Sequence, residues 1–286
     1  MDPRDDIIAR AAAGLSGGQP QRVWSLIVTL FGDLARAPGD SISGAALSRI
    51  TDLAGVRPEA MRVALHRLRK DGWIESERRG RSSIHRLTRS GREQSEVASP
   101  GIYARVPPTP ADWHVLLAGD TASRAALADL LLAQDYVELF PDVAIGPGPV
   151  PAHADELLAF GPAAVPVPGW VRRRICPPAL EQAGHALHAA LGELSEQLAQ
   201  APQPGPGATA ALRTLVVHNW RRLILRHPDL PAGIFPETWA VPACRQRVHD
   251  VLGRLPRPEL AAIEADLAPT SQPTPGPTLV GKYPGG

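Results

Sequence analysis

The segment 56–87 constrains the fold of this chain more than any other part of the sequence. Pro58 suits the first turn of a helix, where its missing N–H costs nothing, and Gly72 suits the left-handed residue that follows a helix. Two short alternating segments, 73–77 and 83–87, come next and are joined by a basic turn. We therefore predict a helix that begins at Pro58 and stops at Gly72, followed by a β-hairpin with an arginine-rich tip.

The predicted helix has an apolar side and a polar side. Its apolar stripe is expected to consist of Met61, Val63, Ala64, Leu65 and Leu68. The opposite side is expected to present Glu59, Arg62, His66, Arg69 and Lys70. The major groove of DNA admits one helix, and long polar side chains on the outer face of that helix can reach the base edges. The pattern is therefore typical of a DNA-reading helix.

Two more helices are predicted before this one. Residues 22–37 have apolar side chains at helical spacing. Ser43 can cap a short helix that runs to Leu53, and a glycine-containing turn at 54–56 separates it from the DNA-reading helix. A short helix, a turn, an amphipathic helix and a hairpin, in this order, predict a winged helix-turn-helix in residues 21–98.

The residues predicted to contact double-stranded DNA come from the second helix of this motif and from the hairpin. Arg62 and His66 are the candidates for reading bases. The tip of the hairpin is expected to touch phosphates or the minor groove. The complete set is Arg57, Glu59, Arg62, His66, Arg67, Arg69, Lys70, Arg78, Arg79, Arg81 and Ser82.

The charge of the chain is unevenly distributed. Residues 41–92 contain 12 Arg or Lys and 5 Asp or Glu, a net charge of +7, whereas the rest contains 18 basic and 24 acidic side chains, a net charge of −6. A solvated basic helix on an ordinary globular domain would give the same charge. The order of the predicted elements favours phosphate neutralisation instead, and with it salt-sensitive binding.

The chain of 286 residues is long enough for two or three domains. Residues 1–20 are expected to form a flexible, loosely ordered leader, and the proline-rich residues 269–286 a disordered tail. The N-terminus has no apolar signal core, and no apolar run reaches the roughly 18 residues that span a bilayer. Two cysteines make no disulfide framework, so we expect a cytoplasmic protein without membrane contact.

The rest of the chain predicts an α+β multi-domain protein. Residues 102–175 are expected to form a small α+β middle domain, and residues 176–268 a helical C-terminal domain. The elements predicted in the middle domain are a strand at 113–118, a helix at 123–134, strands at 136–139 and 143–145, and a weak helix near 154–159.

Two arginine clusters lie outside the predicted DNA-binding domain, one before the helical domain and one within it. They are either exposed or inter-domain ion pairs, or phosphate contacts to a coenzyme A ligand, because clustered guanidinium groups recognise phosphates well. The tryptophan that precedes the second cluster is either a core residue or a surface on which the ligand stacks. The candidates for effector binding are Arg172, Arg173, Arg174, Trp220, Arg221 and Arg222.

Other chemistries lack support in the sequence. His218, His227 and His249 do not form ligand pairs with each other or with Cys244 at the spacing that metal sites use. No Gly-x-Ser-x-Gly elbow and no glycine-rich phosphate loop occur. We therefore expect no metal, no cofactor and no enzymatic activity.

Three parts of the chain together carry a family resemblance. They are 25–33, then 62–73 with 79–83 and 87–91, and finally 223–231 with 235–239. The first ends in Phe31-Gly32-Asp33, and the last contains Asp229-Leu230-Pro231 and a Pro-x-x-Trp segment. In this order they resemble the PaaX family, the repressors of bacterial phenylacetate-degradation operons, over roughly residues 21–267.

The resemblance implies a GntR-like winged helix, a middle domain similar to the ferredoxin-like Cas2 fold, and a helical C-terminal domain. It implies a repressor that binds its operator as a homodimer and is released by an aryl- or acyl-coenzyme A such as phenylacetyl-coenzyme A. We expect the C-terminal helices to form the dimer. The sequence also allows a DNA-binding regulator without a small-molecule effector, whose C-terminal domain serves self-association or protein contacts.

Overall fold

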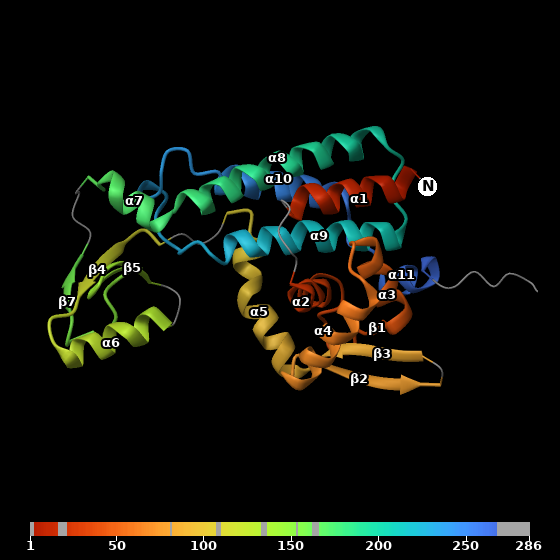
Figure 1. The fold of residues 1–286 in the computed structure, drawn as a ribbon, viewed down its shortest axis with the longest axis horizontal. Helices are drawn as coiled ribbons and strands as arrows, with labels where there is room; N and C mark the ends of the chain where they lie inside the picture. The colour runs from red at the N-terminus through yellow and green to blue at the C-terminus, as the bar shows by residue number, and fades with distance from the viewer. Residues whose placement is uncertain are drawn as a thin grey trace, which may run out of the picture.

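The computed structural model describes residues 3–16, 22–80, 82–106, 110–132, 136–152, 154–161 and 166–267. One long helix, α9 (Pro206–Ile224), lies at the centre of the helical part (Figure 1). Residues 209–220 are buried on every side, as expected for a helix whose apolar side chains do not keep to one stripe. The helices that pack on it include α1 (Pro3–Ser16), α2 (Val23–Leu34), α3 (Gly44–Leu53), α5 (Arg89–Tyr103), α8 (Pro178–Gln200), α10 (Val241–Arg254) and α11 (Leu260–Asp266).

The N-terminal elements below α9 in Figure 1 include a small antiparallel sheet. Helix α4 (Pro58–Lys70) packs on α2 and α3 and leads into the hairpin of β2 (Ile74–Arg79) and β3 (Ser82–Leu87). The short strand β1 (Ile42–Ser43) pairs with β3, so the strand order is β1-β3-β2. The predicted order of helix, helix, turn, helix and hairpin is therefore present.

The local signals that begin and end these helices are confirmed. Helix α4 begins at Pro58, and Gly72 follows its end with a φ of +72°. The Ser43 hydroxyl accepts a hydrogen bond of 3.0 Å from the backbone N–H of Ala46 and so caps α3. Cap and turn chemistry depends on neighbouring residues, which is why the sequence predicts these boundaries well.

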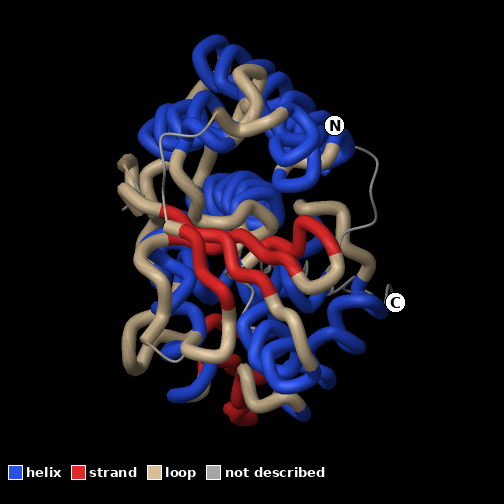
Figure 2. The backbone as a smooth tube through the Cα atoms, turned by 90° about the vertical axis from the view of Figure 1, so that its left-hand side faces the viewer, coloured by secondary structure: helices blue, strands red, loops and turns tan. Residues whose placement is uncertain are grey.

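The middle segment forms a second sheet, at the end of the molecule that faces the viewer in Figure 2. Its strands are β4 (Trp113–Leu117), β5 (Val137–Phe140), β6 (Val143–Pro147) and β7 (Leu158–Phe160), and its helices are α6 (Thr121–Leu132) and α7 (Gly169–Ile175). The strand order is β5-β6-β4-β7, with antiparallel pairing throughout. Apolar side chains of α6 pack on one face of the sheet, and those of α7 pack on the other.

The predicted strands and the first helix of this segment are confirmed, but the weak helix near 154–159 is wrong. Residues 158–160 form β7 instead, because Leu158 and Phe160 pair with Leu117 and Val115 of β4. A three-residue edge strand carries too short a pattern to recognise without its neighbour. The sequence also missed α7.

A buried ion pair joins α2 to α9. The Asp33 carboxylate accepts two hydrogen bonds of 2.9 Å from Arg213, and a third of 3.0 Å from the Tyr103 hydroxyl at the end of α5. The side chains of Asp33 and Arg213 are 0% and 7% exposed. Burial, followed by the negative charge of Asp33, raises the pKa of Tyr103, so the phenol keeps its proton and donates. One polar cluster therefore holds α2, α5 and α9 together.

A single apolar core runs through the N-terminal elements and the C-terminal helices. The same cluster of buried side chains includes Phe31 of α2, Leu65 of α4, Leu191 of α8 and Trp220 of α9. The N-terminal unit is thus packed onto the helical unit rather than linked to it as a separate body. Because this core is shared, the domain limits drawn from the sequence stay a prediction.

The flexible leader predicted for residues 1–20 is wrong where the structure describes it. Residues 3–16 form α1, and Ile8, Ala11 and Leu15 are buried against α8 and α9. These side chains recur at intervals of three and four, so they share one helix face. Its packing partners lie more than 150 residues further along the chain, and local composition could not reveal them.

The sequence pattern at Ser99-Pro100-Gly101 indicates a linker between the predicted winged unit and the middle domain, which is wrong, since α5 continues through Pro100 to Tyr103. The end of this helix is held by the C-terminal helices. Trp220 Nε1 donates a hydrogen bond of 2.9 Å to the carbonyl of Ile102, and Arg245 donates to the carbonyls of Gly101 and Ala104, both at 2.9 Å. These tertiary bonds satisfy carbonyls that a helix end leaves without partners.

The disordered tail predicted at 269–286 lies outside the described residues. In the part of the chain that is described, none of the helices combines the length and the apolar character needed to cross a membrane.

Candidate nucleic-acid interface

Helix α4 turns one side to the core and the other to solvent. Met61, Ala64, Leu65 and Leu68 are buried, at the i, i+3, i+4, i+7 spacing of one stripe. The opposite side is exposed. It contains all of the DNA-contacting residues predicted on this helix, which are Glu59, Arg62, His66, Arg67, Arg69 and Lys70.

Val63 does not belong to the buried stripe, and its predicted place there is wrong. Its side chain is 71% exposed. Helical rotation of roughly 100° per residue sets it away from Met61 and Leu65 and beside His66 on the outward face. Apolar character alone places Val63 in the core, whereas the spacing of the four buried positions leaves it outside the buried stripe.

The charged side chains of α4 are restrained by neighbours on the same helix. Arg62 forms an ion pair of 2.9 Å with Glu59, one turn earlier. Arg67 pairs with Asp71 at 3.3 Å, and its guanidinium lies 5.3 Å from the centroid of the Trp24 ring on α2. Both pairs are well exposed, so each contributes only a few tenths of a kcal/mol, about 0.2–0.5. They can exchange for a phosphate or a base at little cost.

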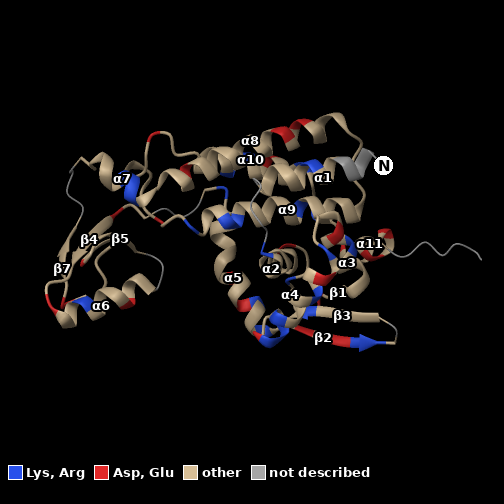
Figure 3. Ribbon diagram, viewed as in Figure 1, with Lys and Arg blue, Asp and Glu red and all other residues tan. Residues whose placement is uncertain are grey.

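The hairpin combines an acidic base with a basic tip (Figure 3). Arg86 on β3 pairs with Glu75 at 3.0 Å and with Glu77 at 2.7 Å, which offsets one of the two negative charges on this part of β2. Arg79 is 3.5 Å from Glu77, near the turn. The positive side chains that extend furthest are therefore those at the tip.

The predicted wing residues lie at this tip where they are described. Arg78, Arg79 and Ser82 are exposed. The turn passes through Gly80 with a φ of +59°, a left-handed conformation that favours glycine. Arg81 lies outside the described residues. Arg57, which precedes α4, is exposed as well.

His85 connects the two strands of the hairpin, a role that sequence reasoning missed. Its ring is buried and contacts the Ser76 hydroxyl at 2.7 Å and the Ser83 hydroxyl at 3.2 Å. Burial and the nearby charge of Arg69 lower the pKa of His85, so the neutral ring is favoured. A Cβ at Gly44 would lie 2.5 Å from Ser83 Oγ. Helix α3 therefore approaches β3 as closely as a glycine allows.

The last described helix contacts the first turn of α3. Glu264 of α11 accepts a hydrogen bond of 2.7 Å from the backbone N–H of Ser43 and contacts the Ser43 hydroxyl at 2.6 Å. A carboxylate at a helix N-terminus is stabilised by the free N–H groups and the helix dipole. The C-terminal end of the described chain thus reaches back to the helix that precedes α4.

The two arginine clusters predicted to bind an effector do not share one pocket in the described structure. Arg172 donates to the carbonyls of Gly233 and Phe235, and Arg174 donates to the carbonyl of Glu138. These contacts connect α7 to neighbouring segments, and Arg174 also pairs with Glu138 at 3.8 Å. Arg173 is exposed.

The second cluster is divided between the core and the surface. Trp220 is fully buried, with its ring N–H bound to Ile102, so the structure favours the core alternative for this residue. Arg221 is mostly buried, which lowers the pKa of its guanidinium. Arg222 lines a cavity of about 310 Å³ between α1, α8 and α9.

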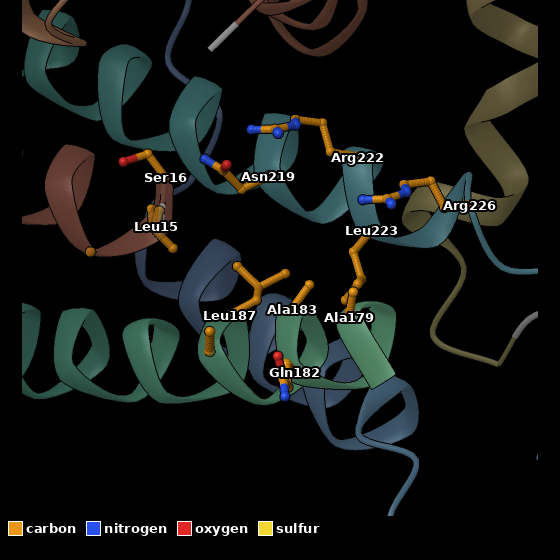
Figure 4. Close-up of a pocket in the computed structure, with 12 residues that line it drawn as sticks. Leu15, Ser16, Ala179, Gln182, Ala183, Leu187, Asn219, Arg222, Leu223 and Arg226 are labelled. Atoms are coloured by element: carbon orange, nitrogen blue, oxygen red, sulfur yellow. The ribbon is translucent and has the colours of Figure 1, made fainter. Parts of the chain in front are cut away.

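This cavity has an apolar wall and a polar rim (Figure 4). Leu15, Ala183, Leu187 and Leu223 are among the apolar side chains, and Arg222 of α9 and Arg226, just after the end of α9, extend beside them. Sites for small molecules are commonly of this size or larger and combine apolar walls with a few polar groups. Among the described residues, no three His, Cys, Asp or Glu side chains gather as metal ligands would.

Two family models match separate parts of the chain. One, described as PaaX-like protein, covers residues 22–91, and the other, PaaX-like protein C-terminal domain, covers residues 178–261. Together they cover more than half of the 286 residues. The chain belongs to the PaaX family. The first match contains α4 and the hairpin, and the second contains α9.

A curated relative of this PaaX-family chain is the transcriptional repressor PaaX of Escherichia coli (strain K12). The two sequences are 28% identical over an alignment of 290 positions. The aligned region covers 91% of this chain and 86% of the relative. A solved structure, the uncharacterized protein Rv0674 from Mycobacterium tuberculosis, is similar at a TM-score of 0.43 and 18% identity. That comparison covers 84% of this chain and 96% of the other.

Proposed function

We propose that this PaaX-family chain is a DNA-binding transcriptional repressor, and that residues 22–91 form a winged helix-turn-helix. Helix α4 enters the major groove, and the β2–β3 hairpin is the wing. The observation that carries the proposal is the outward face of α4, where Arg62, Arg67, Arg69 and Lys70 are exposed on a helix fixed from behind by a buried stripe. The curated relative, a transcriptional repressor, supports the same function.

The test begins with selection of a random pool of DNA duplexes on the full chain. The enriched sequence is then compared with its scrambled version by fluorescence anisotropy at several salt concentrations. We expect at least about 1,000-fold tighter binding to the selected sequence, and affinity that falls steeply as salt rises. Equal affinity for all duplexes would contradict a sequence-specific repressor.

We further propose that the repressor is a homodimer on an inverted repeat, because one winged unit reads only a few base pairs. The C-terminal helices offer less support for the interface than the sequence implied, since their apolar faces pack on each other, on α1 and on α2. A row of apolar side chains on the middle sheet, on the face away from α6, is only partly covered: Phe140 and Leu158 are 53% and 57% exposed, Leu117 is 37% exposed, and Val143 is partly buried. Across the strands it runs through Leu158, Leu117, Val143 and Phe140.

Sedimentation of the full chain without DNA tests the dimer and its interface. We expect a dimer at micromolar concentration, and a monomer when Leu117→Glu is combined with Leu158→Glu. Leu225→Glu, at a half-exposed position after α9, is the matched control. A monomeric parent chain contradicts the dimer. If Leu225→Glu alone dissociates the dimer, the dimer interface lies on the C-terminal helices instead.

For the middle domain we infer a ferredoxin-like arrangement related to the Cas2 fold. Counted along the chain, its four strands lie in the order 4-1-3-2, with the antiparallel pairing of that fold. The connection between β6 and β7 contains no helix among its described residues, and α7 follows β7 instead. A refined experimental structure of residues 102–175 within the full chain is the direct test.

We propose that an acyl- or aryl-coenzyme A thioester, of which phenylacetyl-coenzyme A is the leading candidate, lowers operator affinity. The family resemblance motivates the ligand, and the α1–α8–α9 cavity with Arg222 and Arg226 supports a place for an anionic group beside apolar surface. A ligand that prefers the non-binding conformation a hundredfold shifts the equilibrium by about 2.7 kcal/mol.

Titration of the protein–operator complex with the thioester, the free acid and coenzyme A tests this effector. We expect release by the thioester alone, weakened by Arg226→Gln and unchanged by Arg173→Gln, an exposed arginine outside the cavity. The opposite result for these two variants would move the site to α7. No release by any of the three compounds would favour the alternative of a DNA-binding regulator without a small-molecule effector.

A further inference from the structure

Val63 is the apolar exception on the outward face of α4. Its side chain is 71% exposed, and the neighbours one turn away on that face, Glu59, His66 and Arg67, are polar and exposed. With roughly 100° of rotation per residue, Val63 lies between Glu59 and Arg67 around the helix, about 30° from the line that points directly away from the buried stripe. Whatever approaches α4 from outside meets this isopropyl group.

We propose that Val63 contacts the C5-methyl group of a thymine and selects thymine at one position of each half-site. The inference rests on the proposed function, in which α4 lies in the major groove. Among the groups that the four bases present there, the thymine methyl is the apolar one, while the others accept or donate hydrogen bonds. The polar neighbours of Val63 are suited to those hydrogen bonds, and Val63 is suited to the methyl.

The side chain needs no rearrangement to make this contact. A valine within a helix occupies one χ1 rotamer in about 90% of cases, so its methyl groups keep a fixed direction. The helix itself is fixed by Met61, Ala64, Leu65 and Leu68 in the core. A stiff group on a rigid element loses little entropy on binding, which favours discrimination between thymine and cytosine.

The surroundings of Val63 separate it from an ordinary exposed apolar residue. Single exposed apolar side chains are common on proteins, and Val97 on α5 is one, at 84% exposed. Val63 instead borders a groove between α2 and α4 that is lined by Trp24 and Ala60 and has Arg57 and Arg67 at its edge. Those two arginines can hold a phosphate strand while Val63 faces the bases.

Replacement of thymine by deoxyuridine tests the contact, because it removes the methyl group and leaves the hydrogen-bonding pattern unchanged. Each thymine of the selected operator is replaced in turn, and affinity is measured for the full parent chain, Val63→Ala and Val97→Ala. At one position per half-site we expect the parent and Val97→Ala to lose about fourfold in affinity, the effect of one apolar carbon group. Val63→Ala should bind the thymine operator more weakly and lose nothing further with deoxyuridine.

The outcomes distinguish this inference from the proposed function. If the parent binds its operator selectively but every deoxyuridine replacement is without effect, Val63 does not read a methyl and the repressor function stands. A deoxyuridine effect that persists in Val63→Ala overturns the inference as well, because another side chain then makes the contact. Absence of selective DNA binding by the parent contradicts the repressor itself.

Discussion

Arg62 illustrates how a side chain proposed to read bases is held in the absence of DNA. Its guanidinium is paired with Glu59 at 2.9 Å and also lies 3.4 Å from the carbonyl of Pro58. Both partners belong to the first turn of α4, so the side chain points along the helix toward its N-terminal half. An exposed pair of this kind is weak and limits the side chain to few orientations. Contact with a guanine edge would replace Glu59 by the stronger bidentate partner.

Arg62→Ala should therefore weaken binding to the selected operator by about 1–3 kcal/mol and weaken binding to random DNA much less. Anisotropy with both duplexes gives the two values. Arg124→Ala removes an arginine from a similar exposed pair, with Asp142 in the middle domain, and is the control. Equal losses on the two duplexes would assign Arg62 to phosphate contact instead of base reading.

His218 gives the chain a pH-dependent stability. It is fully buried on α9, and burial, followed by the charges of Arg222 and Arg221, lowers the pKa of His218 to about 3. An unfolded histidine has a pKa near 6.5. Between these values the unfolded chain binds a proton that the folded chain does not. The free energy of unfolding therefore falls as pH decreases below about 6.5, by at most about 1.4 kcal/mol per pH unit.

His218→Gln should remove this contribution. We expect the urea-unfolding free energies of the parent and the variant to converge as pH falls from about 7 toward about 5, since the parent alone loses the His218 term. His66→Gln changes an exposed histidine on α4 and is the control. The difference in unfolding free energy between this variant and the parent should stay constant as pH falls. A constant difference between parent and His218→Gln would show that His218 does not titrate in this range.

At the scale of single elements, the hairpin is acidic where it joins the unit and basic where it ends. Glu75 and Glu77 both pair with Arg86, which offsets only one of their two negative charges, so the base of the hairpin carries no excess positive charge. The positive charge of the proposed wing is therefore concentrated at its tip. This distribution favours contacts of the proposed wing with phosphates or a narrow minor groove over contacts with base edges in the major groove.

Replacing Arg79 and Arg81 together by glutamine should flatten the dependence of log affinity on log salt. Each lost phosphate contact reduces the slope by about 0.9, so the full effect is about 1.8. Arg124→Gln combined with Arg173→Gln removes the same charge from the middle segment and should leave the slope unchanged. An unaltered slope in the wing variant would exclude phosphate contacts at the tip.

Helix α4 also shows which structural features a local sequence pattern can predict. Pro58, Gly72 and the four buried positions from Met61 to Leu68 follow from the sequence, because caps and periodicity are set by residues within one or two turns. Val63 was misassigned because valine is apolar, although the helical period places it outside. His85 has no local signal, since its burial depends on α3 approaching β3 across a glycine.

At the scale of the whole molecule, the N-terminal and helical units share a core and a buried ion pair. Asp33 stands in the aromatic-Gly-Asp segment of the family resemblance, and its partner Arg213 lies 180 residues away. The family resemblance includes Asp33 but does not identify Arg213 as its partner. An arginine in the middle of an apolar helix was the available signal, and only the fold identifies which carboxylate it needs. The same holds for α1, whose burial depends on α8 and α9.

Asp33→Asn should destabilise the whole chain by about 3–5 kcal/mol, because it leaves the Arg213 charge buried without its counter-charge. Urea unfolding followed by tryptophan fluorescence measures the loss. Arg257→Gln is the control, since this half-exposed arginine is 3.7 Å from Asp33 and should change stability by less than about 1 kcal/mol. A small effect of Asp33→Asn would mean that water reaches the pair.

The central position of α9 has a consequence for synthesis of the chain. The face of α2 that packs on α9 is complete in sequence by Leu34, whereas α9 begins at Pro206. At about 5–20 residues per second, the roughly 170 residues between them take on the order of 10–30 s to translate. Throughout that interval the face of α2 that carries Thr29 and Asp33 lacks the partner that later covers it. A chain that stops short of α9 therefore exposes apolar surface to chaperones and proteases, and only a complete one carries a finished DNA-binding unit.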